Sequence, residues 1–363
     1  MQGWQVVGLL GYLPIAYYVL QLLRWIFKRV CRRRKDLEKR YRLNSDGPAW
    51  ALVTGASAGI GLAFCEELAA MGFNLLMLAR TTSTLAAASE RISKEYSVET
   101  RIFPADLSNT SSALRYEIAA RLREHDVSLV VNNAGYARRL PGEFHKTPLS
   151  DLHRTVEVNC KSVALVSHTA LAHFMHRAQT LGVPSRRCCR PKAKIGGLVV
   201  MSSITATSGS PGMSGYAASK AFDKQLAHSL NIEYSNKGVD VLCVKPAYVA
   251  TRLSGATRTG GFPPVISARA CARGSLDCLG HDTETYGHWQ HDVQAALMRM
   301  VPKFLMRDEV REEMQRFTAR KREFLATQSH ELREDNKITS VSIDGDEKRR
   351  NSGASDGETG SLL

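Results

Sequence analysis

From Ala49 onward, short apolar runs alternate with longer amphipathic segments, and this alternation limits the possible folds more than any other feature of the chain. Segments with the helical period of apolar residues, for example Leu152–Arg177 and Tyr216–Tyr234, separate the apolar runs. A repeated order of strand, helix and strand produces a parallel sheet covered by helices on both faces. The sequence therefore predicts an α/β fold with a doubly wound parallel sheet. The expected strands are Trp50–Thr54, Asn74–Ala79, Arg101–Ala105, Ser128–Asn132, Leu198–Ser202 and Val239–Val244.

A glycine-rich turn with the pattern TGxxxGxG follows the first expected strand directly, and a helical segment comes next. The first glycine permits a tight turn, the second lets the backbone approach a pyrophosphate, and the third lets the helix pack close to the strand. The N-terminus of that helix offers free N–H groups to phosphates. This order of strand, turn and helix predicts a Rossmann-type sheet that binds a dinucleotide. The residues expected at the cofactor are Gly55, Ser57, Gly59, Ile60 and Gly61.

The end of the second expected strand distinguishes NADPH from NADH. A site for NADH usually places Asp or Glu there to accept hydrogen bonds from the ribose 2′-hydroxyl. In this chain Ala79 occupies that position and Arg80 follows it. A guanidinium suits a 2′-phosphate, so NADPH is expected, and the alternative is that Arg80 is a solvated loop charge. After the third expected strand, Asp106 either binds the adenine amino group or caps a helix.

Tyr216 and Lys220 lie four residues apart in an expected helix and therefore share one face. Tyrosine titrates near pH 10, and a neighbouring ammonium group lowers that value by stabilising the phenolate. Tyr216 can then give a proton to a carbonyl oxygen while hydride arrives at its carbon, and Lys220 can also bind the nicotinamide ribose. Ser203, at the end of the fifth expected strand, can hold the substrate oxygen. A YxxxK pair alone also occurs by chance on protein surfaces.

Together these motifs resemble the short-chain dehydrogenase/reductase family over about residues 48–255. Asn133 lies in an NNAG element similar to the one with which that family stabilises its central sheet and borders the cofactor. Asn159 matches the family's catalytic asparagine, which holds a water molecule in the proton relay. The resemblance also places Val249 at the cofactor, after a sixth strand where the usual Pro-Gly is replaced by Pro246 and Ala247. It implies a catalytic tetrad of Asn159, Ser203, Tyr216 and Lys220.

A narrower resemblance is to the membrane-bound branch that contains very-long-chain 3-oxoacyl-CoA reductases and 17β-hydroxysteroid dehydrogenases of the endoplasmic reticulum. It implies NADPH-dependent reduction of a 3-oxoacyl-CoA to the 3-hydroxyacyl-CoA in fatty-acid elongation. The expected partners are then the elongase, dehydratase and enoyl reductase of that cycle, and relatives often form homodimers. The segments that carry this resemblance are Trp50–Gly55, Ala79–Thr81, Val98–Arg101, Pro246–Thr251, Ser275–Gly280 and Trp289–His291.

Two other functions compete with this one. The first is the same chemistry on a steroid or another lipophilic ketone or alcohol, because the tetrad recognises only the carbonyl. The second is a nucleotide-binding scaffold that has lost catalysis, against which the intact pair of Tyr216 and Lys220 argues. Residues 250–292, which show no strand pattern, are expected to cover the substrate cleft.

Gly3–Leu23 is a run of 21 residues without a charge, which as a helix is about 30 Å long and matches the hydrocarbon thickness of a bilayer. A basic block follows the run, whereas a signal peptide has its basic residues before the run. We therefore expect a membrane anchor over residues 1–27, spanning or, because of Pro14, a hairpin; a buried core helix is the alternative. Residues 28–47 are then a basic juxtamembrane linker. The positive-inside rule places this linker and the catalytic domain in the cytosol.

The net charge of +14 is concentrated in two segments, residues 24–42 and residues 186–194. The remainder is close to neutral, so a general nucleic-acid-binding surface is not implied. Residues 186–194 form either a solvated insertion or a contact for acidic headgroups or a CoA phosphate. The eight cysteines lack paired CxxC spacing, which suggests reduced thiols. No metal is expected, since the His and Cys residues are too loosely spaced: Cys271, Cys278, His281, His288 and His291.

The chain is therefore expected to contain an NADP-binding domain over residues 48–292. Residues 293–334 follow as amphipathic C-terminal helices, which pack on the catalytic domain or lie on a bilayer surface. Residues 335–363 are polar and rich in Ser, Gly and Asp, which predicts a disordered tail.

Overall fold

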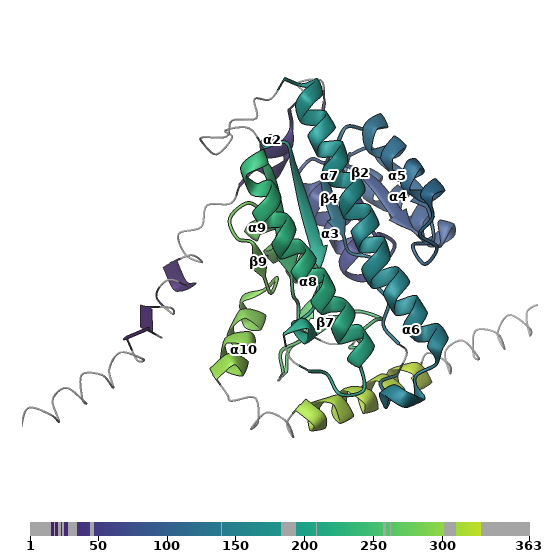
Figure 1. Ribbon diagram of the computed structural model, residues 1–363, viewed down its shortest axis with the longest axis vertical. Coiled ribbons are helices and arrows are strands. Elements are labelled where there is room, and N and C mark those ends of the chain that lie inside the picture. The colour runs from purple at the N-terminus through teal and green to yellow at the C-terminus, as the bar shows by residue number, and fades with distance from the viewer. Residues whose placement is uncertain are drawn as a thin grey trace, which may run out of the picture.

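The computed structural model has a seven-stranded parallel sheet in the order β3-β2-β1-β4-β5-β6-β9 (Figure 1). It describes residues 35–43, 47–138, 140–182, 194–207, 209–256, 259–261, 263–300 and 310–327, and isolated positions between 16 and 27. The order reverses direction between β1 and β4, where a doubly wound sheet binds its ligands. The strands are β1 (Trp50–Thr54), β2 (Asn74–Ala79), β3 (Thr100–Pro104), β4 (Val127–Asn132), β5 (Gly196–Met201), β6 (Val239–Val244) and β9 (Glu284–Thr285).

The helices form two layers that bury the sheet on both faces, as the doubly wound prediction requires. One core cluster packs α3 (Gly59–Ala70), α4 (Thr82–Tyr96) and α9 (Ala268–Cys278) against the sheet. The other cluster packs α5 (Ser112–Glu124), α7 (Ser162–Thr180) and α8 (Ser214–Tyr234) against the opposite face. Every residue of β2, β4, β5 and β6 is buried, which explains why these strands are continuous apolar runs.

The expectation that residues 250–292 contain no strand is wrong. They contain β9, which extends the sheet by pairing with β6, and β8 (Ile266–Ser267), which pairs with β7 (Val249–Ala250). Each of these strands has only two residues, so no alternating pattern can develop in the sequence.

The single helix expected over 152–177 is also interrupted. The structure divides it into α6 (Leu149–Val156), a π-helical turn η2 (Glu157–Lys161) and α7. A π-turn inserts one extra residue into the helical ladder and is frequent at functional sites. Here it contains Asn159.

The predicted membrane anchor over residues 1–27, apart from isolated positions between 16 and 27, and half of the linker over 28–47 lie outside the described residues. Among the residues that are described, the structure has no helix with the length and apolar character needed to span a bilayer. Residues 183–193, 301–309 and 328–363, which include the predicted disordered tail, also lie outside them.

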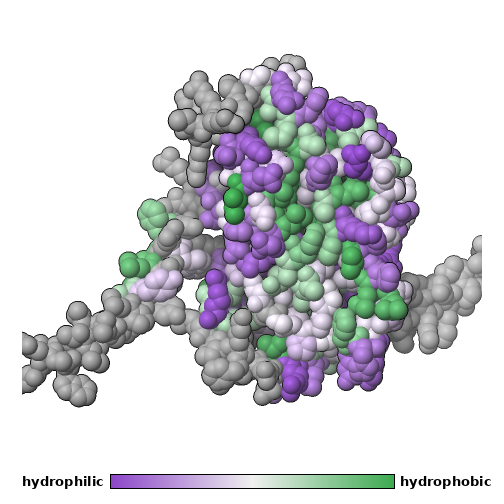
Figure 2. All heavy atoms as spheres, in the orientation of Figure 1, coloured by the Kyte–Doolittle hydropathy of each residue, from purple (hydrophilic) through white to green (hydrophobic). Residues whose placement is uncertain are grey.

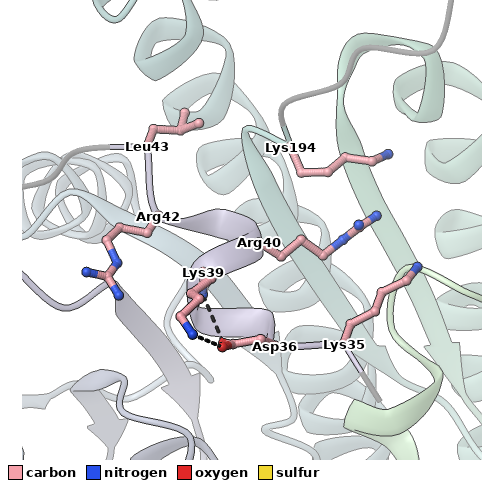
Figure 3. Close-up of a pocket in the computed structure, with 7 residues that line it drawn as sticks. All are labelled: Lys35, Asp36, Lys39, Arg40, Arg42, Leu43 and Lys194. Carbon is pink, nitrogen blue, oxygen red and sulfur yellow. Dashed lines mark hydrogen bonds and ion pairs between the residues drawn. The ribbon is translucent and has the colours of Figure 1, made fainter. Parts of the chain in front are cut away.

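The described part of the basic linker, α2 (Leu37–Tyr41), docks at the amino end of β6. Asp240 accepts hydrogen bonds from Arg40 Nε at 2.8 Å and Tyr41 Oη at 2.9 Å, and it pairs with Lys194 Nζ at 2.8 Å. In Figure 3 the side chains of Lys35, Arg40 and Lys194 extend in the same direction from the rim of a shallow pocket of about 510 Å³. The two basic segments of the sequence therefore meet around one buried carboxylate.

Candidate active site

A cleft of about 1270 Å³ opens at the carboxyl ends of β1, β4, β5 and β6. This volume exceeds the usual range for a single small ligand, about 300–1,000 Å³, so the cleft has room for a dinucleotide and a second molecule. Ten of the residues singled out in the sequence line it: Gly55, Ser57, Gly59, Ile60, Arg80, Asn133, Ser203, Tyr216, Lys220 and Val249. Three others, Gly61, Asp106 and Asn159, do not line it.

The glycine turn has the shape that a bound pyrophosphate requires. Gly59 has a φ of +58°, which other residues rarely adopt, and it begins α3. A Cβ atom on Gly61 would overlap the carbonyl oxygen of Gly55, so the helix can pack this closely on the turn only with glycine there. Ala58 provides no side-chain cap and the first turn of α3 contains no acid, which leaves its N–H groups for phosphate oxygens.

Asn133 joins the end of β4 to the end of β1. Its Nδ2 donates to the carbonyl oxygen of Thr54 at 2.9 Å. The hydroxyl of Thr54 accepts from the backbone N–H groups of Asn133 and Ala134, both at 2.9 Å. These hydrogen bonds tie the ends of the two neighbouring strands together at the floor of the cleft.

Arg80 follows β2 and lines the cleft, while Asp106, which is exposed, does not line it. Asp106 is not the cap of α5, because the hydroxyl of Ser111 accepts from Leu114 N at that helix start. Instead, Asp106 accepts from Ser108 N at 2.9 Å. Burial acts to raise the pKa of Asp106, but the hydrogen bonds from Ser108 and the nearby charge of Arg80 lower it overall. Arg80 therefore presents a cation to the cleft, and Asp106 lies close enough to be affected by its charge.

Tyr216 and Lys220 lie on the face of α8 that borders the cleft, as their spacing predicts. Lys220 is 4% exposed, and its Nζ lies 6.0 Å from the centre of the Tyr216 ring. That nitrogen donates to Met201 O at 2.9 Å and to Asp223 Oδ2 at 2.8 Å. Burial acts to lower the pKa of Lys220, but the charge of Asp223 raises it overall, so Lys220 remains protonated.

Ser203 lies beside these residues, at the end of β5. Its Oγ accepts from Thr205 N at 3.2 Å, which leaves the hydroxyl hydrogen for a ligand. Sequence reasoning missed Thr205, whose buried Oγ1 lies in the cleft wall and has no hydrogen-bond partner among the described residues. In the sequence, Thr205 is marked only by its position two residues after Ser203, which is a weak signal.

Asn159 lies behind the cleft, where its side chain connects η2 to α8. Its Oδ1 accepts from Tyr136 N at 2.7 Å, and its Nδ2 donates to Tyr136 O at 2.8 Å and to Ser219 Oγ at 2.9 Å. Since all three contacts are made within the protein, the side chain itself acts as a clamp. Sequence reasoning also missed Ser219 and Asp223, each three residues beyond a member of the tetrad.

Beyond β6, Ala247 replaces the glycine common in the family without backbone strain. It does not have a positive φ, and its N–H donates to the buried His291 Nδ1 at 3.2 Å. Within the described part of the chain, no group of three His, Cys, Asp or Glu residues is arranged to hold a metal. Cys271 and His291 are instead buried in the packing of this region.

Two C-terminal helices, α10 (Trp289–Met300) and residues 310–327, lie below the carboxyl ends of the strands and line the cleft (Figure 1). Phe317 stacks on Tyr248 with 5.7 Å between ring centres, and Lys321 Nζ donates to Arg138 O at 3.1 Å. The amphipathic C-terminal helices therefore pack on the catalytic domain.

A family model described as short chain dehydrogenase matches residues 49–260, which is more than half of the chain. The chain belongs to the short-chain dehydrogenase family. This short-chain dehydrogenase is an oxidoreductase that acts on alcohol and carbonyl groups. Its relatives place it in the branch of hydroxysteroid dehydrogenases and 3-oxoacyl-CoA reductases.

Among these relatives, the inactive hydroxysteroid dehydrogenase-like protein 1 of Homo sapiens is 30% identical, with 75% of this chain and 76% of the relative covered. The very-long-chain 3-oxoacyl-CoA reductase of Caenorhabditis elegans is 29% identical over 83% of this chain and 90% of its own. The putative steroid dehydrogenase 3 of the same organism is 28% identical, with the same two coverages.

Solved structures of the family share the fold. The bulky-bulky ketone specific alcohol dehydrogenase of Comamonas testosteroni is 27% identical with a TM-score of 0.54, covering 70% of this chain and 95% of its own. A short-chain dehydrogenase of Sphingobium yanoikuyae, solved in complex with NADPH, is 26% identical with a TM-score of 0.54. The match covers 70% of this chain and 97% of that structure's chain.

Proposed function

We propose that this short-chain dehydrogenase reduces the ketone of a 3-oxoacyl-CoA with NADPH. One observation carries the proposal: Ser203, Tyr216 and Lys220 line a single cleft that is large enough for a dinucleotide and a second molecule. The bound nicotinamide would supply the hydride. Ser203 and Tyr216 would hold the carbonyl oxygen, and Tyr216 would give it a proton. Lys220 has three donors, two of which are used within the protein, so the third is available for a ribose hydroxyl.

Arg80 supports NADPH as the cofactor. It is the residue after β2 that lines the cleft, and no acid occupies the position that would accept the 2′-hydroxyl of NADH. The relative from Sphingobium yanoikuyae was solved with NADPH. Asp106, which lies close enough to Arg80 to be affected by its charge, would help to hold the guanidinium in place.

The far wall of the cleft supports a substrate with a long apolar part and an anionic end. Apolar side chains from three segments line this wall: Leu253, Leu297, Met298, Met314 and Phe317. Arg252 and Arg316 also line the cleft and are exposed, so they can meet the phosphates of CoA, which would compete with Glu312 for Arg316. The nematode relative named as a 3-oxoacyl-CoA reductase agrees with this substrate class.

A lipophilic steroid is the second candidate substrate. The same apolar wall would accept it, and other relatives carry steroid dehydrogenase names. A steroid has no phosphates, so it would leave Arg252 and Arg316 unused. The two candidates can therefore be separated by the contribution of these arginines to substrate KM.

We further propose that residues 1–27 anchor the protein in the endoplasmic reticulum membrane, with the catalytic domain facing the cytosol and the elongation enzymes as partners. The uncharged run and the basic block after it support this placement.

A homodimer through α7 and α8 is also part of the proposal. Apolar side chains gather on the face that these helices present in Figure 2, and Phe222 and Ile232 of α8 are 41% and 66% exposed.

The test is NADPH oxidation by the purified protein with a 3-oxoacyl-CoA, compared with estrone and androstenedione. The proposal expects oxidation with the acyl-CoA and a raised KM in the Arg316→Ala variant. Oxidation with the steroids alone would replace the substrate assignment by the second candidate. NADPH binding without turnover of any of these compounds would indicate a silent scaffold.

A further inference from the structure

Asp223 is a buried acid one helical turn beyond Lys220, and neither the sequence motifs nor the family match assigns it a role. The residue is 0% exposed. Its Oδ2 lies 2.8 Å from Lys220 Nζ, while its Oδ1 has no hydrogen-bond partner among the described residues. A carboxylate is buried in this way only at a large desolvation cost, and its sole strong partner here is the ammonium that faces the tyrosine.

The surroundings of Asp223 contain few other titratable groups. On α8 it faces Lys220, with Tyr216 on the other side of that ammonium. From η2 it faces the thiol of Cys160, and from β6 the thiol of Cys243. Burial raises the pKa of each thiol, so both are neutral. Among the described residues, Lys220 is therefore the cation that acts most directly on Asp223.

We propose that Asp223 is a positioning residue that holds Lys220 and offsets the positive charge that Lys220 presents to Tyr216, so that the site is suited to giving a proton to a ketone. The inference rests on the proposed function, because it concerns the same proton donor. An ammonium acting alone would stabilise the phenolate strongly, and a phenolate accepts a proton from an alcohol instead of donating one to a ketone. A carboxylate beside the ammonium weakens that effect.

The ionisation of Asp223 agrees with this role. Burial raises the pKa of Asp223 to about 6, against the lowering effect of Lys220. The carboxylate is therefore mostly charged at neutral pH, where reduction would take place. It also fixes the direction of Lys220: Met201 O and Asp223 take two of the three donors, which points the third toward the cleft.

The experiment compares the wild-type protein with Asp223→Asn and Asp223→Glu, and uses Glu233→Gln as the matched control. Glu233 lies on the same helix, is 56% exposed at its side chain and pairs only weakly with Lys237, at 3.8 Å. We expect Asp223→Asn to shift the alkaline limb of the pH profile of the reduction rate to lower pH, by on the order of one pH unit. At neutral pH the kcat of the reverse oxidation should gain severalfold relative to the kcat of reduction, with compensating changes in KM because the overall equilibrium constant stays the same. Asp223→Glu and Glu233→Gln should keep the wild-type profile.

An unchanged alkaline limb in a folded Asp223→Asn variant, checked by thermal unfolding and NADPH binding, would overturn the inference. If Asp223→Asn does not fold, Asp223→Ser provides the same neutral comparison with a smaller side chain. A second readout does not need activity: the ultraviolet tyrosinate signal of each protein, minus that of its Tyr216→Phe counterpart, follows the Tyr216 proton directly. If the wild type reduces none of the carbonyl compounds, the proposed function fails, whereas this signal still decides the inference.

Discussion

We propose that Arg80, the residue after β2, decides between NADPH and NADH. Arg80 is a cation that lines this part of the cleft, and the anionic Asp106 lies close enough to be affected by its charge. A 2′-phosphate gains a charge-assisted hydrogen bond from a guanidinium, whereas a 2′-hydroxyl gains little. The preference between the cofactors is therefore assigned to one side chain.

Replacing Arg80 by Ala should weaken NADPH binding by roughly ten- to a hundredfold, which corresponds to about 1.5–3 kcal/mol for a hydrogen bond to a charged group. NADH binding should change little. Fluorescence titration with both cofactors measures this. Arg101→Ala is the matched control, because Arg101 lies on the neighbouring strand β3 with its side chain 54% exposed. Equal losses for NADPH and NADH in Arg80→Ala would show that Arg80 does not bind the 2′-phosphate.

At the scale of elements, the π-helical turn η2 connects the helix pair α6–α7 to the catalytic helix α8. Asn159 makes this connection with three hydrogen bonds, two to the backbone of Tyr136 and one to Ser219. Ser219 is one turn from Tyr216 and next to Lys220. The position of the proton donor therefore depends on a clamp that lies outside the cleft.

Asn159→Ala should lower the free energy of unfolding by about 1–3 kcal/mol, since it leaves partly buried backbone groups of Tyr136 without partners. It should also lower kcat, because α8 loses its brace. Asn231→Ala is the control: Asn231 ties the far end of α8 to Val241 O at 2.9 Å, so it should lose stability but keep kcat. Urea unfolding and steady-state kinetics measure both. A full kcat in a stable Asn159→Ala variant would contradict the clamp.

The elements were predictable where burial left a regular pattern. The strands β1, β2 and β6 match their predicted bounds, because each is a continuous apolar run that ends at a clear break. The strand β9 has two residues, which is too short for any period, and η2 keeps the apolar spacing of an ordinary helix. Asp223 could not be foreseen, since an acid on an amphipathic helix is usually solvated, and only the packing of α8 reveals its burial.

At the scale of the whole molecule, one buried carboxylate joins the two basic segments to the sheet. Asp240 holds Arg40, Tyr41 and Lys194 at the end of the sheet opposite the cleft. Burial acts to raise the pKa of Asp240, but Arg40 and Lys194 lower it overall. A lowered pKa in the folded state means that this group stabilises the fold above the ordinary carboxyl pKa near 4, and that the contribution disappears as the pH falls through the folded value.

Asp240→Asn should therefore lower the free energy of unfolding at neutral pH by about 2–4 kcal/mol, because it leaves the half-buried cations Arg40 and Lys194 without a counter-charge. The difference from wild type should shrink in acid. Denaturant unfolding at several pH values measures this. Asp36→Asn is the control, since Asp36 pairs with Lys39 in an exposed position and its loss should cost less than about 1 kcal/mol. A pH-independent difference would contradict the assigned role of Asp240.

The central claim, that Tyr216 is the proton donor in a cleft that binds the dinucleotide independently of it, has one direct test. Tyr216→Phe keeps the ring and removes only the hydroxyl, so NADPH affinity measured by fluorescence should remain within about twofold of wild type while the rate of ketone reduction falls by roughly 10²–10⁴-fold. Retained turnover in a variant that still binds NADPH would contradict the assignment of Tyr216.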